Sequence, residues 1–207
     1  MDSEITILGT GASRTNYDFS TETWGVCGAY SFREEYLEAG KPFHMEKLFV
    51  TDHLFSPAGA LHFDLRRIQR TIDEYGMQFI SLHPMQIGSY KIKVTRYPIN
   101  RIIKKFNIDY FSSTICYVMA YALDKNVKKI NLHGVDMSTK QEYFLQKAGV
   151  EYWIGRANQM GVGVFVAEGS SLMKTPNSFR YGTKPKYNMK LVDPRGLLKN
   201  KCTTKTT

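Results

Sequence analysis

The sequence is poor in cysteine and contains no long apolar run. Its three cysteines, Cys27, Cys116 and Cys202, lie far apart and form no CxxC pair, which argues for a reducing compartment and against a thiolate metal site. The longest apolar runs have about six residues, whereas a membrane span needs roughly 20. The acidic first residues lack the basic and apolar regions of a signal peptide. We therefore expect a cytoplasmic protein without a membrane segment.

The patterns of metal sites and of serine hydrolases are also missing. The five histidines are scattered, and no two of them have the spacing of metal ligands. A GxSxG motif is absent, which argues against a Ser-His-Asp hydrolase. We expect no metal ligands and no metal requirement.

Positive charge is unevenly distributed along the 207 residues. The net charge is +9, but residues 183–207 hold seven basic residues and one acid, so this segment carries +6. Such a terminus is typical of a solvated tail, although a tail that docks on a neighbouring subunit or on nucleic acid has the same composition. The sequence thus predicts a single Rossmann-like nucleotide-binding domain over residues 1–182 and a basic C-terminal tail over residues 183–207.

Short apolar runs alternate with helical patterns along the chain. This alternation, with short connections and nearly continuous apolar strands, predicts an α/β fold: an open, mainly parallel Rossmann-like sheet with helices on both faces. Pro98 is expected to end a short strand. The expected strands are 5–8, 23–30, 47–52, 79–82, around 92–94, 128–136 and 162–167, and the expected helices are 61–75, 114–125 and 140–160.

Ligands of open parallel sheets bind outside the carboxyl ends of the strands, so the residues at strand ends are the candidate site. Glycines in the loop 9–14 allow the backbone to approach an oxyanion, to which Ser13 adds a hydroxyl and Arg14 a cation. The loop matches neither GxGxxG nor a P-loop, so a simple tight turn is the alternative. The predicted nucleotide-binding residues are Gly9, Thr10, Gly11, Ala12, Ser13, Arg14, Gly28, Asp52, Ser112, Ser113, Thr114, Asp136, Glu168, Ser170 and Ser171.

Several of these residues also have ordinary structural roles. Residues 112–114 either hold an anion at a helix start or cap that helix. For Asp136 the alternatives are binding a ribose hydroxyl, orienting a metal or capping the next loop. For residues 168–171 they are closing a pocket or forming an ordinary turn. His53, His83 and His133, at or near strand ends, are the candidate general bases.

Residues 112–123 and 129–137 resemble the central motif of two related groups of proteins. These groups are the bacterial family-42 sialyltransferases and the 6-hydroxymethylpterin pyrophosphokinase-like (motility accessory factor) proteins. Both have a Ser/Thr-Ser helix start and a strand that ends in Gly-Ile/Val-Asp. Residues 9–13 correspond to their Gly-Asn-Gly-Pro-Ser loop, and residues 163–172 to their last strand and turn. The resemblance extends in blocks over residues 4–175 and includes small uncharacterised bacteriophage proteins.

The resemblance implies a cytidine-type or other nucleotide donor held by the residues that match the motifs. Three positions differ: Thr10 and Asp52 replace asparagines, and Gly28 stands near where another is expected. The sialyltransferases carry a general-base histidine in a Tyr-Ile-Gly-His segment, but residues 137–141 here contain none. The resemblance therefore supports nucleotide binding more strongly than transfer. The residues that it implicates are Gly9, Gly11, Ser13, Ser112, Ser113 and Asp136.

Three hypotheses for function follow. The leading one is a nucleotide-binding group transferase, of glycosyl type, that uses a nucleotide or nucleotide-sugar donor. The second is a non-catalytic phage protein that sequesters a nucleotide as a regulator or in counter-defence, in the host cytoplasm. The third is a nucleic-acid-modifying enzyme guided by the basic tail. The aromatic residues over 143–153 are interpreted as core or as the contact of a homodimer.

Overall fold

The computed structural model describes residues 3–52, 63–82, 92–139 and 141–174. Seven strands in this part of the chain form one sheet in which every neighbouring pair is parallel. The mainly parallel Rossmann-like sheet predicted from the sequence is thereby confirmed. The strands are β1 (Glu4–Leu8), β2 (Glu22–Val26), β3 (Lys47–Val50), β4 (Gln78–Ser81), β5 (Val94–Arg96), β6 (Lys129–His133) and β7 (Gly163–Val166).

The order of the strands reverses once. Across the sheet they follow the order β5-β4-β3-β2-β1-β6-β7. The chain therefore builds outward from β1 to β5 and then returns to the other side of β1 with β6 and β7. The order reverses between β1 and β6, and ligands of open parallel sheets bind at the carboxyl ends of the strands near such a point.

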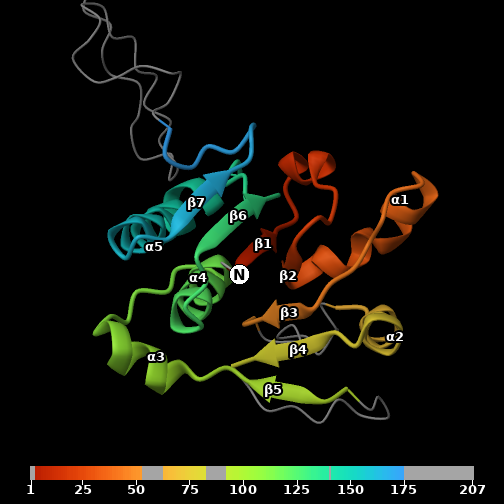
Figure 1. The fold of residues 1–207 in the computed structure, drawn as a ribbon, viewed down its shortest axis with the longest axis horizontal. Helices are drawn as coiled ribbons and strands as arrows, with labels where there is room; N and C mark the ends of the chain where they lie inside the picture. The colour runs from red at the N-terminus through yellow and green to blue at the C-terminus, as the bar shows by residue number, and fades with distance from the viewer. Residues whose placement is uncertain (1–2, 53–62, 83–91, 140, 175–207) are drawn as a thin grey trace, which may run out of the picture.

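Helices cover both faces of the sheet (Figure 1). One face packs against α3, α4 and α5, while the other packs against η2 and α2. Each face has its own hydrophobic core, and alternate residues of β3 belong to different cores. Phe49 packs into the core of the first face, and Leu48 and Val50 pack into the core of the second. The helical segments are η1 (Ala12–Asn16), η2 (Cys27–Phe32), α1 (Arg33–Glu38), α2 (Leu65–Tyr75), α3 (Ile99–Phe106), α4 (Thr114–Asp124) and α5 (Lys147–Gln159).

Helix α4 is the central helix of the first face. Its residues are apolar around almost the whole circumference, and Cys116, Val118 and Ala122 have no exposed surface. The helix contacts β2 and β3 on one side and α3 and α5 on the others, so it needs no polar face. This burial fixes the position of its first turn at the carboxyl edge of the sheet.

Several boundaries differ from those predicted. The apolar run 23–30 is not one strand, because β2 ends at Val26 and the chain turns at Cys27, whose φ is 49°, into η2. Pro98 follows β5, as predicted, and also directly precedes helix α3. Neither α3 nor α1 was predicted from the sequence. The predicted helix 140–160 begins as a π-helical turn, Glu142–Gln146, before α5.

None of the described helices has the length and apolar character that crossing a membrane requires. The basic tail 183–207 lies outside the described residues, as do His53 and His83. The predictions made for them therefore remain predictions.

Candidate functional site

A cavity of about 450 Å³ lies at the carboxyl edge of the sheet, at the point where the strand order reverses. Residues after β1, β2, β3, β4 and β6 line it, together with the first turn of α4 and the π-helical turn before α5. Its lining includes these predicted site residues: Gly9, Thr10, Asp52, Ser112, Ser113, Thr114 and Asp136.

The glycines of the first loop bring the ends of β1 and β6 together. The amide of Gly9 donates to the His133 carbonyl at 2.8 Å, and that of Gly11 donates to the Gly134 carbonyl at 2.7 Å. A Cβ on Gly9 would collide with the Gly134 carbonyl, and Gly134 itself has a φ of 68°. These glycines are thus required by a close backbone contact within the protein.

Ser13 and Asp136 form a polar link between the same two loops. The Ser13 amide donates to Asp136 Oδ2 at 3.0 Å, and the Ser13 hydroxyl donates to Asp136 Oδ1. Ser13 Oγ also accepts from the Gly134 amide at 2.9 Å. Asp136 is buried and lines the cavity, but both of its carboxylate oxygens are already bound by Ser13.

Arg14 is held by neighbouring residues and is not among those that line the cavity. Its guanidinium stacks 3.9 Å from the centroid of the Phe32 ring, pairs with Glu35 at 3.0 Å and donates to the Gly11 carbonyl at 3.2 Å. Ala12 and Gly28 also lie outside the lining, although a Cβ on Gly28 would touch Thr10.

The first turn of α4 opens into the cavity. Ser113 is the N-cap residue, has extended backbone angles and makes no capping hydrogen bond with its side chain. The Cys116 amide donates to the Ser113 carbonyl at 3.0 Å, whereas the first amides of a helix in general have no acceptor within the helix and carry partial positive charge. Ser113, Thr114 and Ile115 all line the cavity, so this end of the helix can receive an anion.

The hydroxyl groups beside this helix end are positioned by the protein. Ser112 donates to the Gln146 carbonyl at 3.0 Å. Thr114 Oγ1 lies 2.7 Å from the hydroxyl oxygen of Thr51, which follows β3. These bonds fasten the α4 turn to the walls of the cavity.

Cys27 lies in the cavity beside Asp52 and Thr114. Its Sγ lies 3.4 Å from both Asp52 Oδ2 and Thr114 Oγ1, and its single hydrogen can be donated to one of them at a time. Burial raises the pKa of this thiol to about 12, and the Asp52 carboxylate adds to the effect while the bond to Thr114 opposes it. Cys27 is therefore a neutral thiol near pH 7 and no thiolate nucleophile.

The turn after β7 braces the cavity wall. Ser170 Oγ donates to the Val135 carbonyl at 2.7 Å. The Ser171 amide donates to the backbone carbonyl of Asp136, and the Ser171 hydroxyl donates to the backbone carbonyl of Met137. Ser170, Ser171 and the exposed Glu168 are not among the lining residues.

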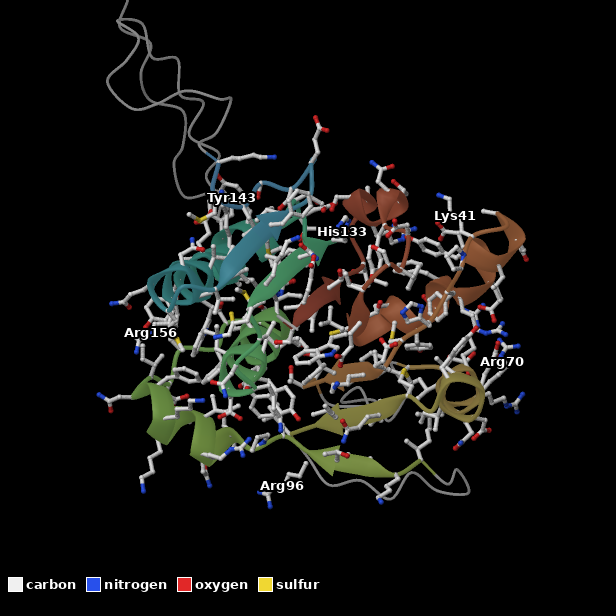
Figure 2. All side chains as sticks on the ribbon, viewed as in Figure 1. Lys41, Arg70, Arg96, His133, Tyr143 and Arg156 are labelled. Atoms are coloured by element: carbon white, nitrogen blue, oxygen red, sulfur yellow. The ribbon has the colours of Figure 1, made fainter. Side chains whose placement is uncertain are left out.

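His133 is the one candidate base that the described residues include. It is the last residue of β6 and is labelled in Figure 2. Its ring centroid lies 5.0 Å from that of Tyr17 and 5.7 Å from that of Phe165. Burial lowers its pKa, and its Nδ1 is buried without a hydrogen-bond partner. The residues that line the cavity do not include it.

Some lining residues were not predicted from the sequence. Thr51, Glu142 and Gln146 were missed, and of these only Glu142 carries a recognisable signal. Thr139 and Glu142 form a capping box, in which the Thr139 amide donates to Glu142 Oε2 at 3.1 Å and the Glu142 amide to Thr139 Oγ1 at 3.2 Å. Within the described ranges, no cluster of three or more His, Cys, Asp or Glu residues could hold a metal ion.

The fold and the cavity define an α/β protein of Rossmann type with a ligand cavity at the switch point of its sheet. No protein-family model and no curated sequence matches the chain. Solved structures of a sialyltransferase are similar to it, and the chain accordingly has a sialyltransferase-like, glycosyltransferase-type fold.

The similarity covers most of the chain at low sequence identity. For CstII from Campylobacter jejuni in complex with CMP-3FNeuAc, the TM-score is 0.53 at 17% identity, covering 79% of this chain and 79% of that chain. For a CST-II variant in complex with CMP, the TM-score is 0.54 at 15% identity, covering 85% and 87%. For CST-II with a trisaccharide acceptor and CMP, it is 0.50 at 13% identity, covering 80% and 81%.

Proposed function

We propose that this protein binds a nucleotide-activated donor in the cavity and transfers its glycosyl group to an acceptor. The observation that carries the proposal is the open first turn of α4, which lines the cavity without a side-chain cap at Ser113. A phosphate bound there would accept from the free amides and meet the positive end of the helix.

The surroundings of this helix end fit a nucleotide. A cavity of about 450 Å³ is within the usual range for small-molecule sites. The solved structures with this fold hold CMP or a CMP-sugar analogue, which favours the same class of ligand here.

The first experiment is a binding screen. Isothermal titration calorimetry and thermal shift would be run with CMP, UMP, GMP, AMP and their nucleotide-sugars, with and without EDTA. We expect at least one nucleotide to bind and to raise the melting temperature, and we expect the same result in EDTA. Ligand at about 100 times its Kd adds roughly 2.7 kcal/mol to the free energy of unfolding. Absence of binding by every compound would refute the proposal.

A pair of variants tests where the phosphate lies. In Ser113→Asp the carboxylate caps α4, which is expected to stabilise the fold by about 0.5–1 kcal/mol while blocking the anion. Ser113→Ala leaves the helix end open and should retain binding within a few-fold. Loss of binding in the more stable aspartate variant alone would support the assignment, whereas equal affinity of both variants would exclude it.

Turnover separates an enzyme from a protein that sequesters its ligand. An enzyme releases the nucleotide from the donor in the presence of an acceptor, and chromatography would detect the free nucleotide. A sequestering protein returns the donor intact after denaturation.

A further inference from the structure

We propose that Glu142 is the general base of the transfer reaction, an assignment that rests on the function proposed above. Transfer to a hydroxyl acceptor requires a group that removes the acceptor proton. Glu142 lies in the π-helical turn before α5, lines the cavity and is partly exposed to solvent.

Three carboxylates line the cavity, and their surroundings differ. Asp136 is buried, and its two oxygens accept the Ser13 amide and hydroxyl, so it serves to hold the loops together. Asp52 accepts the Cys27 thiol, which also reaches Thr114, the first residue of α4. Asp52 therefore lies near the start of α4, which is the proposed position of the phosphate and of the leaving group.

Glu142 belongs to another wall of the cavity. Asp52 follows β3, whereas Glu142 lies in the turn between β6 and α5, and β2 and β1 lie between these two strands. Gln146 of the same turn accepts the Ser112 hydroxyl at 3.0 Å, so this wall adjoins the start of α4. A base on this wall is therefore separate from Asp52 and close to a sugar whose phosphate lies at the α4 turn.

The capping box orients the Glu142 carboxylate. Oε2 accepts the Thr139 amide at 3.1 Å, and the amide of Glu142 is held by Thr139 Oγ1 at 3.2 Å. Oε1 receives no hydrogen bond from the described residues, which leaves it available for the acceptor hydroxyl. The other titratable groups that line the cavity are Cys27, Asp52, Tyr117 and Asp136, and Lys147 follows one turn later and lies over Tyr143.

The step balances with the donor and acceptor alone. The acceptor oxygen forms a bond to the anomeric carbon of the donor sugar while the bond from that carbon to the phosphate oxygen breaks. The electron pair of the broken bond stays on the nucleotide phosphate. The acceptor proton moves to Glu142 Oε1 and is later released to water.

The test compares Glu142→Gln with wild type and with Glu38→Gln, a matched change at an exposed end of α1. Glutamine satisfies a capping box as well as glutamate does, so the turn is retained. CMP-N-acetylneuraminic acid and UDP-, GDP- and ADP-sugars would be offered with saccharide acceptors, and nucleotide release would be followed. We expect kcat to fall about 10²–10⁴-fold in Glu142→Gln, while the Kd for the donor, measured by calorimetry, changes less than about twofold.

The pH profile provides a readout that a merely structural role would not affect. A general base loses activity when it is protonated, which gives kcat a falling limb on the acid side of the profile. We expect this acid limb in wild type and its disappearance in Glu142→Gln. An unchanged kcat in Glu142→Gln, or an acid limb that this variant retains, would overturn the assignment. Binding of nucleotide without consumption of any donor would overturn it too, while leaving nucleotide binding intact.

Discussion

At the scale of single residues, Ser13 is the clearest case of a side chain used by the fold. Its hydroxyl donates to Asp136 and accepts from the Gly134 amide, so removing it leaves two partly buried partners unsatisfied. We expect Ser13→Ala to lower the free energy of unfolding by about 1–3 kcal/mol, measured by urea denaturation. The exposed Ser3→Ala is the control. Unchanged stability together with lost nucleotide affinity would instead assign the hydroxyl to the ligand.

His133 should make stability depend on pH. Burial places its folded-state pKa below the ordinary value of 6.5. Above that value both states are neutral, and no stability is lost. As pH falls below it, the unfolded chain binds a proton that the folded protein does not, so stability decreases until the folded pKa is passed.

The test is the change in unfolding free energy between about pH 7.5 and pH 5.5. His133→Phe keeps an aromatic ring beside Tyr17 and Phe165 but does not titrate. The variant should therefore lose less stability than wild type over this interval. Equal losses in the two proteins would mean that His133 takes no part in the pH dependence.

At the scale of elements, α5 contains two glycines in different surroundings. A Cβ on Gly149 would overlap the Ser112 hydroxyl and lie 3.0 Å from Ser112 Cβ, whereas a Cβ on Gly155 would meet nothing within 4 Å. Gly149 thus permits the close approach of α5 to the cavity wall. It is a packing requirement that a helical pattern in the sequence does not reveal.

Alanine substitutions at the two positions should have opposite effects. Gly155→Ala is expected to stabilise the protein by about 0.5–1 kcal/mol through helix propensity. Gly149→Ala should destabilise it by about 1–3 kcal/mol and weaken nucleotide binding, because Ser112 must move away from Gln146. Thermal unfolding and calorimetry measure both effects. A Gly149→Ala protein as stable as Gly155→Ala would contradict the close approach.

The elements themselves were predicted where their patterns are strong. Strand β1 and helix α4 stand out because they are continuous apolar segments bounded by glycines or hydroxyl residues. Helices α1 and α3 were missed because they have only six and eight residues, too few for a periodic pattern. The split of residues 23–30 depends on the backbone angle of Cys27, a non-glycine residue at which no turn signal exists.

At the scale of the whole molecule, the basic tail and the nucleotide site should act independently of each other. Residues 183–207 carry +6 of the net charge of +9. Deleting them is expected to leave nucleotide affinity and unfolding of the 1–182 protein unchanged, and to abolish any salt-sensitive binding of DNA or RNA. Fluorescence anisotropy with labelled oligonucleotides at two salt concentrations measures this. Oligonucleotide binding that survives the deletion would remove the role of the tail.

The sequence alone determined the class of fold and the chemical character of the strand ends. Alternating apolar runs and helical patterns are local, and a parallel sheet gathers the carboxyl ends of its strands at one edge whatever its details. Glycines, hydroxyls and carboxylates at these positions were therefore visible before any coordinates. So was the absence of a histidine from residues 137–141.

Only the tertiary structure decided which of these groups are available to a ligand. Ser13 meets Asp136 across 123 positions of sequence, and Gly149 meets Ser112 from another helix. Local patterns contain no information on such pairs, because a side chain's partners depend on how distant elements pack. The same packing brings Glu142 to the cavity and leaves the α4 turn open, and these two features carry the proposals for chemistry and binding.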